Sequence, residues 1–79
     1  MRDRDIRAML RAATAAKFLD GWQGPHVTGR SYYIAPRGGG AMDCTLDYVI
    51  GYCEMLAMAG IRPLYRESEP WNLGPETVV

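Results

Sequence analysis

The sequence predicts a small α+β domain, with two helices packed on a sheet of two or three strands in the order α-β-(β)-α-β. Two stretches, Asp3–Leu19 and Thr45–Ala59, repeat apolar residues every three or four positions, as amphipathic helices do. Two shorter stretches, Arg30–Ala35 and Ile61–Glu67, contain the β-branched and aromatic residues that favour strands. Nine glycines and five prolines among 79 residues indicate short elements, so one domain covers 1–79.

The first helix is expected to begin at Asp3 or Asp5, because either carboxylate can cap it and favours its positive end. Gly21 is a natural position for the chain to stop being helical. The positions that recur at helical spacing form the expected core face: Ile6, Met9, Leu10, Ala13 and Ala16.

The middle of the chain predicts a loop at Trp22–Pro25, a short hairpin turned by Thr28-Gly29, and a strand that Pro36 ends. Arg37–Gly40 is then a flexible connector between this strand and the second helix. A phosphate cradle is the alternative there, because backbone N–H groups at a helix N-terminus attract anions.

The second helix is capped by Thr45 or Asp43 and is followed by Gly60. It is apolar on two adjacent stripes, so we expect it to be the central element, packed on both the first helix and the sheet. The residues expected to be nearly fully buried are Leu46, Ile50 and Cys53, with a second stripe of Tyr48, Tyr52 and Met55 beside them. Gly51 is unfavourable inside a helix, which indicates close approach of another element.

Pro63 cannot donate to a strand ladder, so Ile61–Glu67 is expected at a sheet edge, connected by one right-handed crossover. Residues 68–79 form a loose tail. A third strand comes from His26–Val27 or from the C-terminal Thr77–Val79.

The zero net charge hides an asymmetry. Before Met42 there are seven basic and three acidic residues, whereas from Asp43 onward there are two basic and six acidic ones. Such asymmetry concerns partners, not fold.

Cys44 and Cys53 lie nine positions apart on one expected helix, too far for a disulfide, and free thiols fit a reducing cytosol. The charged N-terminus shows no signal peptide, and no apolar run is long enough for a membrane span.

No motif indicates catalysis, a cofactor or a metal. His26, Cys44 and Cys53 lack the close-spaced pairs of a structural zinc site. Cys44 and His26 could form a nucleophile pair, with the Cys44 pKa lowered at a helix N-terminus, but a domain this small has little room for a closed pocket. We therefore expect no enzyme, no cofactor and no metal.

Basic and aromatic residues supply the expected binding site. One group combines Arg30, Tyr32 and Arg37, on a strand beside the glycine-rich segment. A second group lies at helical spacing on the outer face of the first helix, where we expect exposure: Arg4, Arg7 and Arg11. Trp22 and Trp71 either close the core or join an interface, and at least some tyrosines are expected at an interface, because aromatic residues and arginine dominate interface hot spots.

The layout of helix Asp3–Leu19, strand Arg30–Ala35, helix Thr45–Ala59 and strand Ile61–Glu67 resembles the small phage and prophage inhibitors called anti-CRISPR proteins. The resemblance implies a non-catalytic inhibitor that binds a CRISPR effector, or surveillance, complex in the host cytoplasm and blocks target DNA or nuclease engagement. The chain departs from strongly acidic DNA-mimicking members, so occlusion of a protein surface is the expected mechanism.

Two other functions stay open: an autonomous nucleic-acid-binding module, and a subunit that dimerises through the apolar second helix. The expected partner is a protein complex, with possible indirect contact to nucleic acid and none to membrane. The chain itself is expected to be a monomer or a weak dimer.

Overall fold

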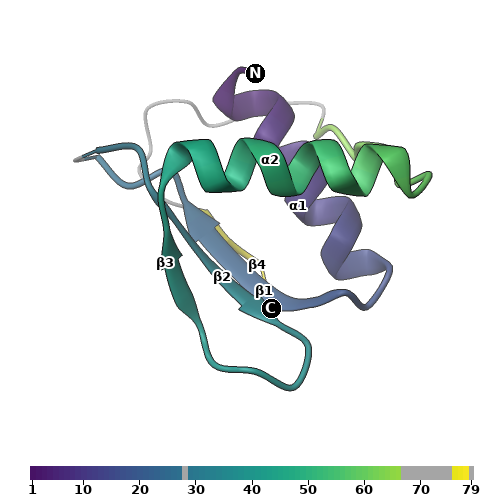
Figure 1. Cartoon of the computed structure of the whole chain (residues 1–79), viewed down its shortest axis with the longest axis horizontal. Helices are drawn as coiled ribbons and strands as arrows, with labels where there is room; N and C mark the ends of the chain where they lie inside the picture. The colour runs from purple at the N-terminus through teal and green to yellow at the C-terminus, as the bar shows by residue number, and fades with distance from the viewer. Residues whose placement is uncertain (28, 67–75, 79) are drawn as a thin grey trace.

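The computed structural model describes residues 1–27, 29–66 and 76–78 (Figure 1). The elements are, in order, α1 (Asp3–Ala15), β1 (Leu19–Gly24), β2 (Tyr32–Pro36), β3 (Met42–Cys44), α2 (Leu46–Met58) and β4 (Glu76–Val78). The α+β class and the order of elements are confirmed. Within the described residues the sheet has four strands instead of two or three, in the order β3-β2-β1-β4. All neighbouring strands are antiparallel.

Helix α1 is shorter than predicted at its C-terminus. It ends because Lys17 adopts a left-handed conformation, with φ of 69°, and the Phe18 N–H donates to the Ala13 carbonyl at 2.9 Å. Arg2 occupies the N-cap without a side-chain bond, so neither Asp3 nor Asp5 caps the helix as expected. Both carboxylates lie in the first turn instead, where the helix dipole favours them.

Strand β1 occupies the residues predicted as the end of the helix and the following loop. Trp22 lies opposite Ile34 of β2 and Val78 of β4, so it stands at the centre of the sheet. The β1–β2 hairpin is longer than the predicted two-residue turn, because its connection covers residues 25–31 and is closed by a bond from His26 N–H to the Ser31 carbonyl, at 2.9 Å. Thr28 itself lies outside the described residues.

The glycine-rich segment connects β2 to β3, not a strand to a helix, so the phosphate-cradle interpretation is wrong. No helix begins directly after Arg37–Gly40. Moreover, the Gly38 N–H already donates to the Asp20 carboxylate at 3.1 Å. The segment is therefore an ordinary hairpin connection.

The bounds of α2 agree with the prediction. The Thr45 hydroxyl accepts the Tyr48 N–H at 3.3 Å, and Gly60 leaves the helix with a φ of 91°. The burial of its residues differs from the prediction. Cys53 is fully buried, whereas Leu46 and Ile50 are only partly buried; the other two deeply buried positions are Val49 and Leu56. One face of α2 packs inward, not two.

Helix α1, and not α2, is the central element. It packs against β1 and against α2, and Figure 1 shows α2 crossing in front of it. Residues 61–66 run beside α1 without regular structure: the Leu64 N–H donates to the Ala8 carbonyl at 3.0 Å. The strand predicted at Ile61–Glu67 is therefore wrong over these residues, and Glu67 lies outside the described part. Helix α1 buries residues 6–10 together with Ala12 and Ala13, whereas Ala15 and Ala16, the latter predicted on the core face, are exposed.

The C-terminal strand prediction is confirmed for Thr77 and Val78, which pair with β1, while Val79 lies outside the described residues. Residues 76–78 thus belong to the sheet and not to a loose tail; the rest of that predicted tail is outside the described residues. The right-handed crossover predicted from strand Arg30–Ala35 to strand Ile61–Glu67 is wrong, because residues 61–66 form no strand. The core joins α1, α2 and the sheet through Ile6, Met9, Leu10, Ala13, Leu19, Trp22, Tyr32, Ile34, Cys44, Val49, Cys53 and Leu56.

Candidate protein-binding surface

The three residues predicted to share one binding site on β2 do not form a patch. Arg30 precedes β2 and Arg37 follows it, so they lie at opposite ends of a strand of five residues, more than about 13 Å apart at 3.3 Å per residue. Tyr32 lies between them but is completely buried. Both arginines are exposed and remain available to a partner, whereas Tyr32 is not accessible to one.

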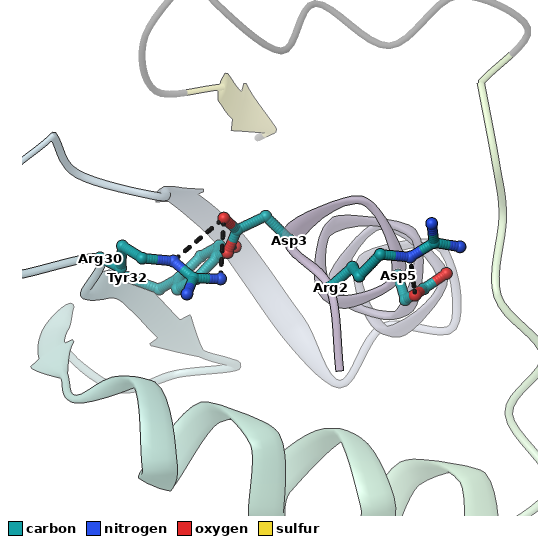
Figure 2. A network of polar contacts seen from close by, with 5 residues as sticks. All are labelled: Arg2, Asp3, Asp5, Arg30 and Tyr32. Carbon is teal, nitrogen blue, oxygen red and sulfur yellow. Dashed lines mark hydrogen bonds and ion pairs between the residues drawn. The ribbon is translucent and has the colours of Figure 1, made fainter.

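Asp3 explains why Tyr32 belongs to the core. The Tyr32 hydroxyl donates to Asp3 Oδ1 at 2.8 Å, and Arg30 donates to Oδ2 with its Nη2 at 3.0 Å and its Nε at 3.2 Å (Figure 2). Burial raises the pKa of Tyr32 far above its ordinary value, and the Asp3 hydrogen bond raises it further. The same carboxylate raises the pKa of Arg30 through its hydrogen bond. This group fixes the start of α1 to the β1–β2 hairpin.

The expected basic face on α1 is wrong. Arg7 is only 1% exposed. Arg4 and Arg11 are half-buried: the Arg4 guanidinium lies 4.4 Å from the centre of the Tyr65 ring, and Arg11 Nη1 donates to the Leu64 carbonyl at 2.6 Å. These side chains hold residues 61–66 against α1. The nucleic-acid-binding alternative used this face together with the basic and aromatic group on β2, and one member of each group, Arg7 and Tyr32, is buried.

Asp5 makes a second contact to the 61–66 segment. The Tyr65 hydroxyl donates to its carboxylate, and Arg2 Nε lies 3.7 Å away. The Tyr65 hydrogen bond is the main reason that the pKa of Asp5 is lowered, and Arg2 and Arg4 add to the effect. Asp3 and Asp5 point to different sides of the helix end in Figure 2, so the first turn of α1 holds two distant parts of the chain.

The cysteines and the histidine do not form a reactive site. Both thiols are free and buried, and Cys44 lies on β3 instead of at a helix N-terminus. Burial raises the pKa of Cys44 and raises that of Cys53 to about 12, so the predicted lowering for Cys44 is wrong. His26 packs edge-on against Tyr33, with ring centres 4.5 Å apart. Among the described residues, no three metal-binding side chains gather.

Helix α2 carries exposed apolar side chains on the α2 outer face, which we define as Tyr48, Gly51, Met55 and Met58. The side chains of Tyr48, Met55 and Met58 are 56%, 62% and 88% exposed, respectively. At 3.6 residues per turn the four positions fall within a sector of roughly 80°. The prediction that Tyr48 and Met55 form a second buried stripe is wrong, because β1 and α2 both pack on α1 and no described element covers this side.

An acidic edge borders the α2 outer face. Asp47 and Glu54 lie seven positions apart, two turns along the same side of the helix, and both are exposed. Helix α2 carries no basic residue. Within the described residues neither carboxylate forms a hydrogen bond or an ion pair, so the negative edge is open to a partner.

Comparison with protein-family models, curated proteins and solved structures finds no match. In the described part of the chain, no helix has the length and apolar character needed to cross a membrane.

The apolar stripes of α2 are the sequence signal for this surface, but they predict burial and not exposure. An apolar helix is usually buried on several sides, but a chain of this length has few elements with which to cover it. Gly51 predicted close approach of another element, but among the described residues nothing comes within 4 Å of the position of its absent Cβ atom. Of the two tryptophans, Trp22 is core and Trp71 lies outside the described residues.

Proposed function

We propose that this chain is a small non-catalytic inhibitor that acts by binding a protein surface. The observation that carries the proposal is the α2 outer face, where Tyr48, Met55 and Met58 are exposed together. Large apolar side chains gathered on one surface are typical of interaction sites, and tyrosine is enriched among residues that dominate binding energy. The raised thiol pKa values support binding over nucleophilic catalysis.

The finer proposal names the target class as a CRISPR effector complex. It is supported by the resemblance of the predicted layout to anti-CRISPR inhibitors; of that layout the two helices and the strand at β2 are present, whereas residues 61–66 form no strand. Occlusion of a protein surface suits this chain better than DNA mimicry, because its net charge is zero. The proposal places this action in the cytoplasm of the host cell, where two free cysteines are stable in reduced form.

The experiment measures inhibition of DNA targeting in bacteria that carry one defined CRISPR system at a time, with direct binding of each purified effector complex as the second readout. Tyr48→Glu combined with Met55→Glu is expected to abolish inhibition, because it places charge on the exposed apolar surface. The control is Phe18→Glu, which changes an exposed apolar residue outside α2. Circular dichroism verifies the fold of each variant. Absence of both inhibition and binding across the panel of effector types would reject the finer proposal.

Arg30 and Arg37 form a separate arm of this experiment. Both are exposed, and they lie at opposite ends of β2. If Arg30→Ala reduces inhibition and Arg37→Ala does not, the contact extends from α2 toward the β1–β2 hairpin. Tyr32→Ala is unsuitable as a binding variant, because it removes a fully buried ring and the fold would suffer.

The same exposed face favours one other function, a subunit that dimerises through α2. The two functions differ in the mass of the isolated chain. A mass that doubles in the micromolar range, and returns to the monomer value in the Tyr48→Glu, Met55→Glu variant, would favour the dimerising subunit.

A further inference from the structure

Gly51 stands at the centre of the α2 outer face without a role in the monomer. A glycine inside a helix costs about 1 kcal/mol relative to alanine. In the described part of the chain nothing within 4 Å would obstruct a Cβ atom at this position, so packing among these residues does not require the glycine. Tyr48 and Met55 project from the neighbouring turns on either side. The missing side chain leaves a shallow notch in which another backbone can come close to α2.

The shape of the face matches a helix. From Tyr48 to Met58 it extends about 15 Å along the axis, at 1.5 Å per residue. Helices approach each other most closely where small residues lie at the crossing point, and the axis separation depends on the side chains there. Methionine adapts its shape to an apolar partner, which suits Met55 and Met58 to packing around such a crossing. A helix crossing at Gly51 would therefore contact all three exposed apolar side chains.

The charge on the face defines the partner further. Asp47 and Glu54 line one edge only, and the two carboxylates have no partner within the described residues. The half-buried Tyr52 lies toward the other edge, which carries no charge. A complementary surface is thus apolar along its centre and basic along one side.

We propose that the α2 outer face binds an apolar helix of the target protein that crosses at Gly51 and carries Lys or Arg along the edge that meets Asp47 and Glu54. This inference rests on the proposed function and adds the chemistry of the partner. It also assigns a role to the acidic half of the chain, whose carboxylates on α2 become recognition groups.

A second copy of this chain fits the face less well. In an antiparallel pair of α2 helices related by a two-fold axis, the acidic edges of both copies lie on the same side. Four carboxylates would then line one side of the interface, and α2 has no basic residue to offset them. Like charges placed together oppose association.

The test uses two synthetic helical peptides of about 18 residues, a length at which a good helix former is partly helical in water. Both carry a leucine stripe; one has arginines along one edge of the stripe and its twin has glutamates there. Binding is measured by fluorescence anisotropy. The arginine peptide is expected to bind about tenfold more tightly, because two exposed ion pairs contribute at most about 1 kcal/mol each. Asp47→Lys with Glu54→Lys is expected to reverse this preference, and the control Asp43→Lys, an exposed change on β3, to leave it unchanged.

Gly51→Gln separates recognition from stability. It fills the notch with a side chain that favours helix, so the melting temperature is expected to rise while affinity for the arginine peptide falls about tenfold. Equal binding of both peptides, an unchanged affinity in Gly51→Gln, or a reversal produced by Asp43→Lys would overturn the inference. Dimerisation that requires Gly51 would also overturn it.

The inference and the proposed function can fail separately. If the chain inhibits a CRISPR effector and the α2 variants inhibit equally well, the function stands and the inference falls. If the arginine peptide binds as expected while no effector is inhibited, the surface stands and the function falls.

Discussion

Gly24 and Gly51 are expected to respond to the same substitution with opposite signs. Gly24 ends β1 with a φ of 152°, a conformation that residues with a side chain rarely adopt. A Cβ atom there would lie 2.8 Å from Cγ of Tyr32. The ring cannot move aside, because Tyr32 is fully buried and its hydroxyl is bonded to Asp3.

The magnitude for Gly24→Ala follows from two costs and one gain. The unfavourable backbone conformation costs about 1–3 kcal/mol, and forcing extra volume against a packed ring costs about 1–3 kcal/mol. The less flexible unfolded chain offsets about 0.5–1 kcal/mol. The net loss is about 1–5.5 kcal/mol, against the roughly 4–12 kcal/mol expected for a chain of this length. Gly51→Ala, in open space, should instead stabilise by about 0.5–1 kcal/mol.

The assay is urea denaturation followed by far-UV circular dichroism. With a slope near 1 kcal/mol per molar, Gly24→Ala should lower the midpoint by about 1 M or more, and Gly51→Ala should raise it by about 0.5–1 M. If Gly24→Ala alone does not fold, it is measured in the Gly51→Ala background. A Gly24→Ala midpoint within about 0.5 M of the parent would refute the packing argument.

Three further predictions concern the core, the 61–66 segment and the thiols. Leu10→Ala should cost about 2–5 kcal/mol in urea denaturation and Ile50→Ala clearly less, because Leu10 is fully buried and Ile50 only partly; equal losses would contradict the central place of α1. Tyr65→Phe should cost about 0.5 kcal/mol near pH 7. Because the folded state lowers the pKa of Asp5, this contribution is present above about pH 4 and is lost as the pH falls below it, so a difference that persists at about pH 2 would count against the bond. Cys44 and Cys53 should react with a thiol reagent at about pH 8 only at the rate of opening or unfolding, since both are buried with raised pKa values; rapid labelling of the native chain would be inconsistent with this.

Local chemistry made the second helix predictable. Threonine is favoured at the start of a helix and glycine just after its end, and Thr45 and Gly60 occupy these two positions in α2. The bounds of α2 therefore agree with the prediction. The end of α1 was not predictable in this way, because Lys17 takes the left-handed conformation that glycine usually takes. Gly21 and Gly24 suggested turns, yet they lie within β1, where Gly24 serves the close approach of Tyr32.

Tertiary context decided the candidate site. Periodicity placed Arg7 on the same side as Arg4 and Arg11 correctly, but it could not show that residues 61–66 cover that side. The same limitation applied to α2, whose apolar stripes predicted burial without showing which neighbours were available. Tyr32 was predicted as a contact residue from its type, whereas its partner Asp3 lies 29 positions away. Such pairings depend on the fold and not on the neighbouring sequence.

The cover of α1 comes from the far end of the chain. Leu64 bonds to Ala8, Tyr65 to Asp5, and Val78 stands beside Trp22 in the sheet. Folding must therefore close long loops before these contacts form, which slows a domain relative to helical bundles of similar size. During synthesis, α1 leaves the ribosome before residues 61–66, the segment that packs along it. Truncation after Gly60 would consequently expose the most buried helix of the protein without altering one of its residues.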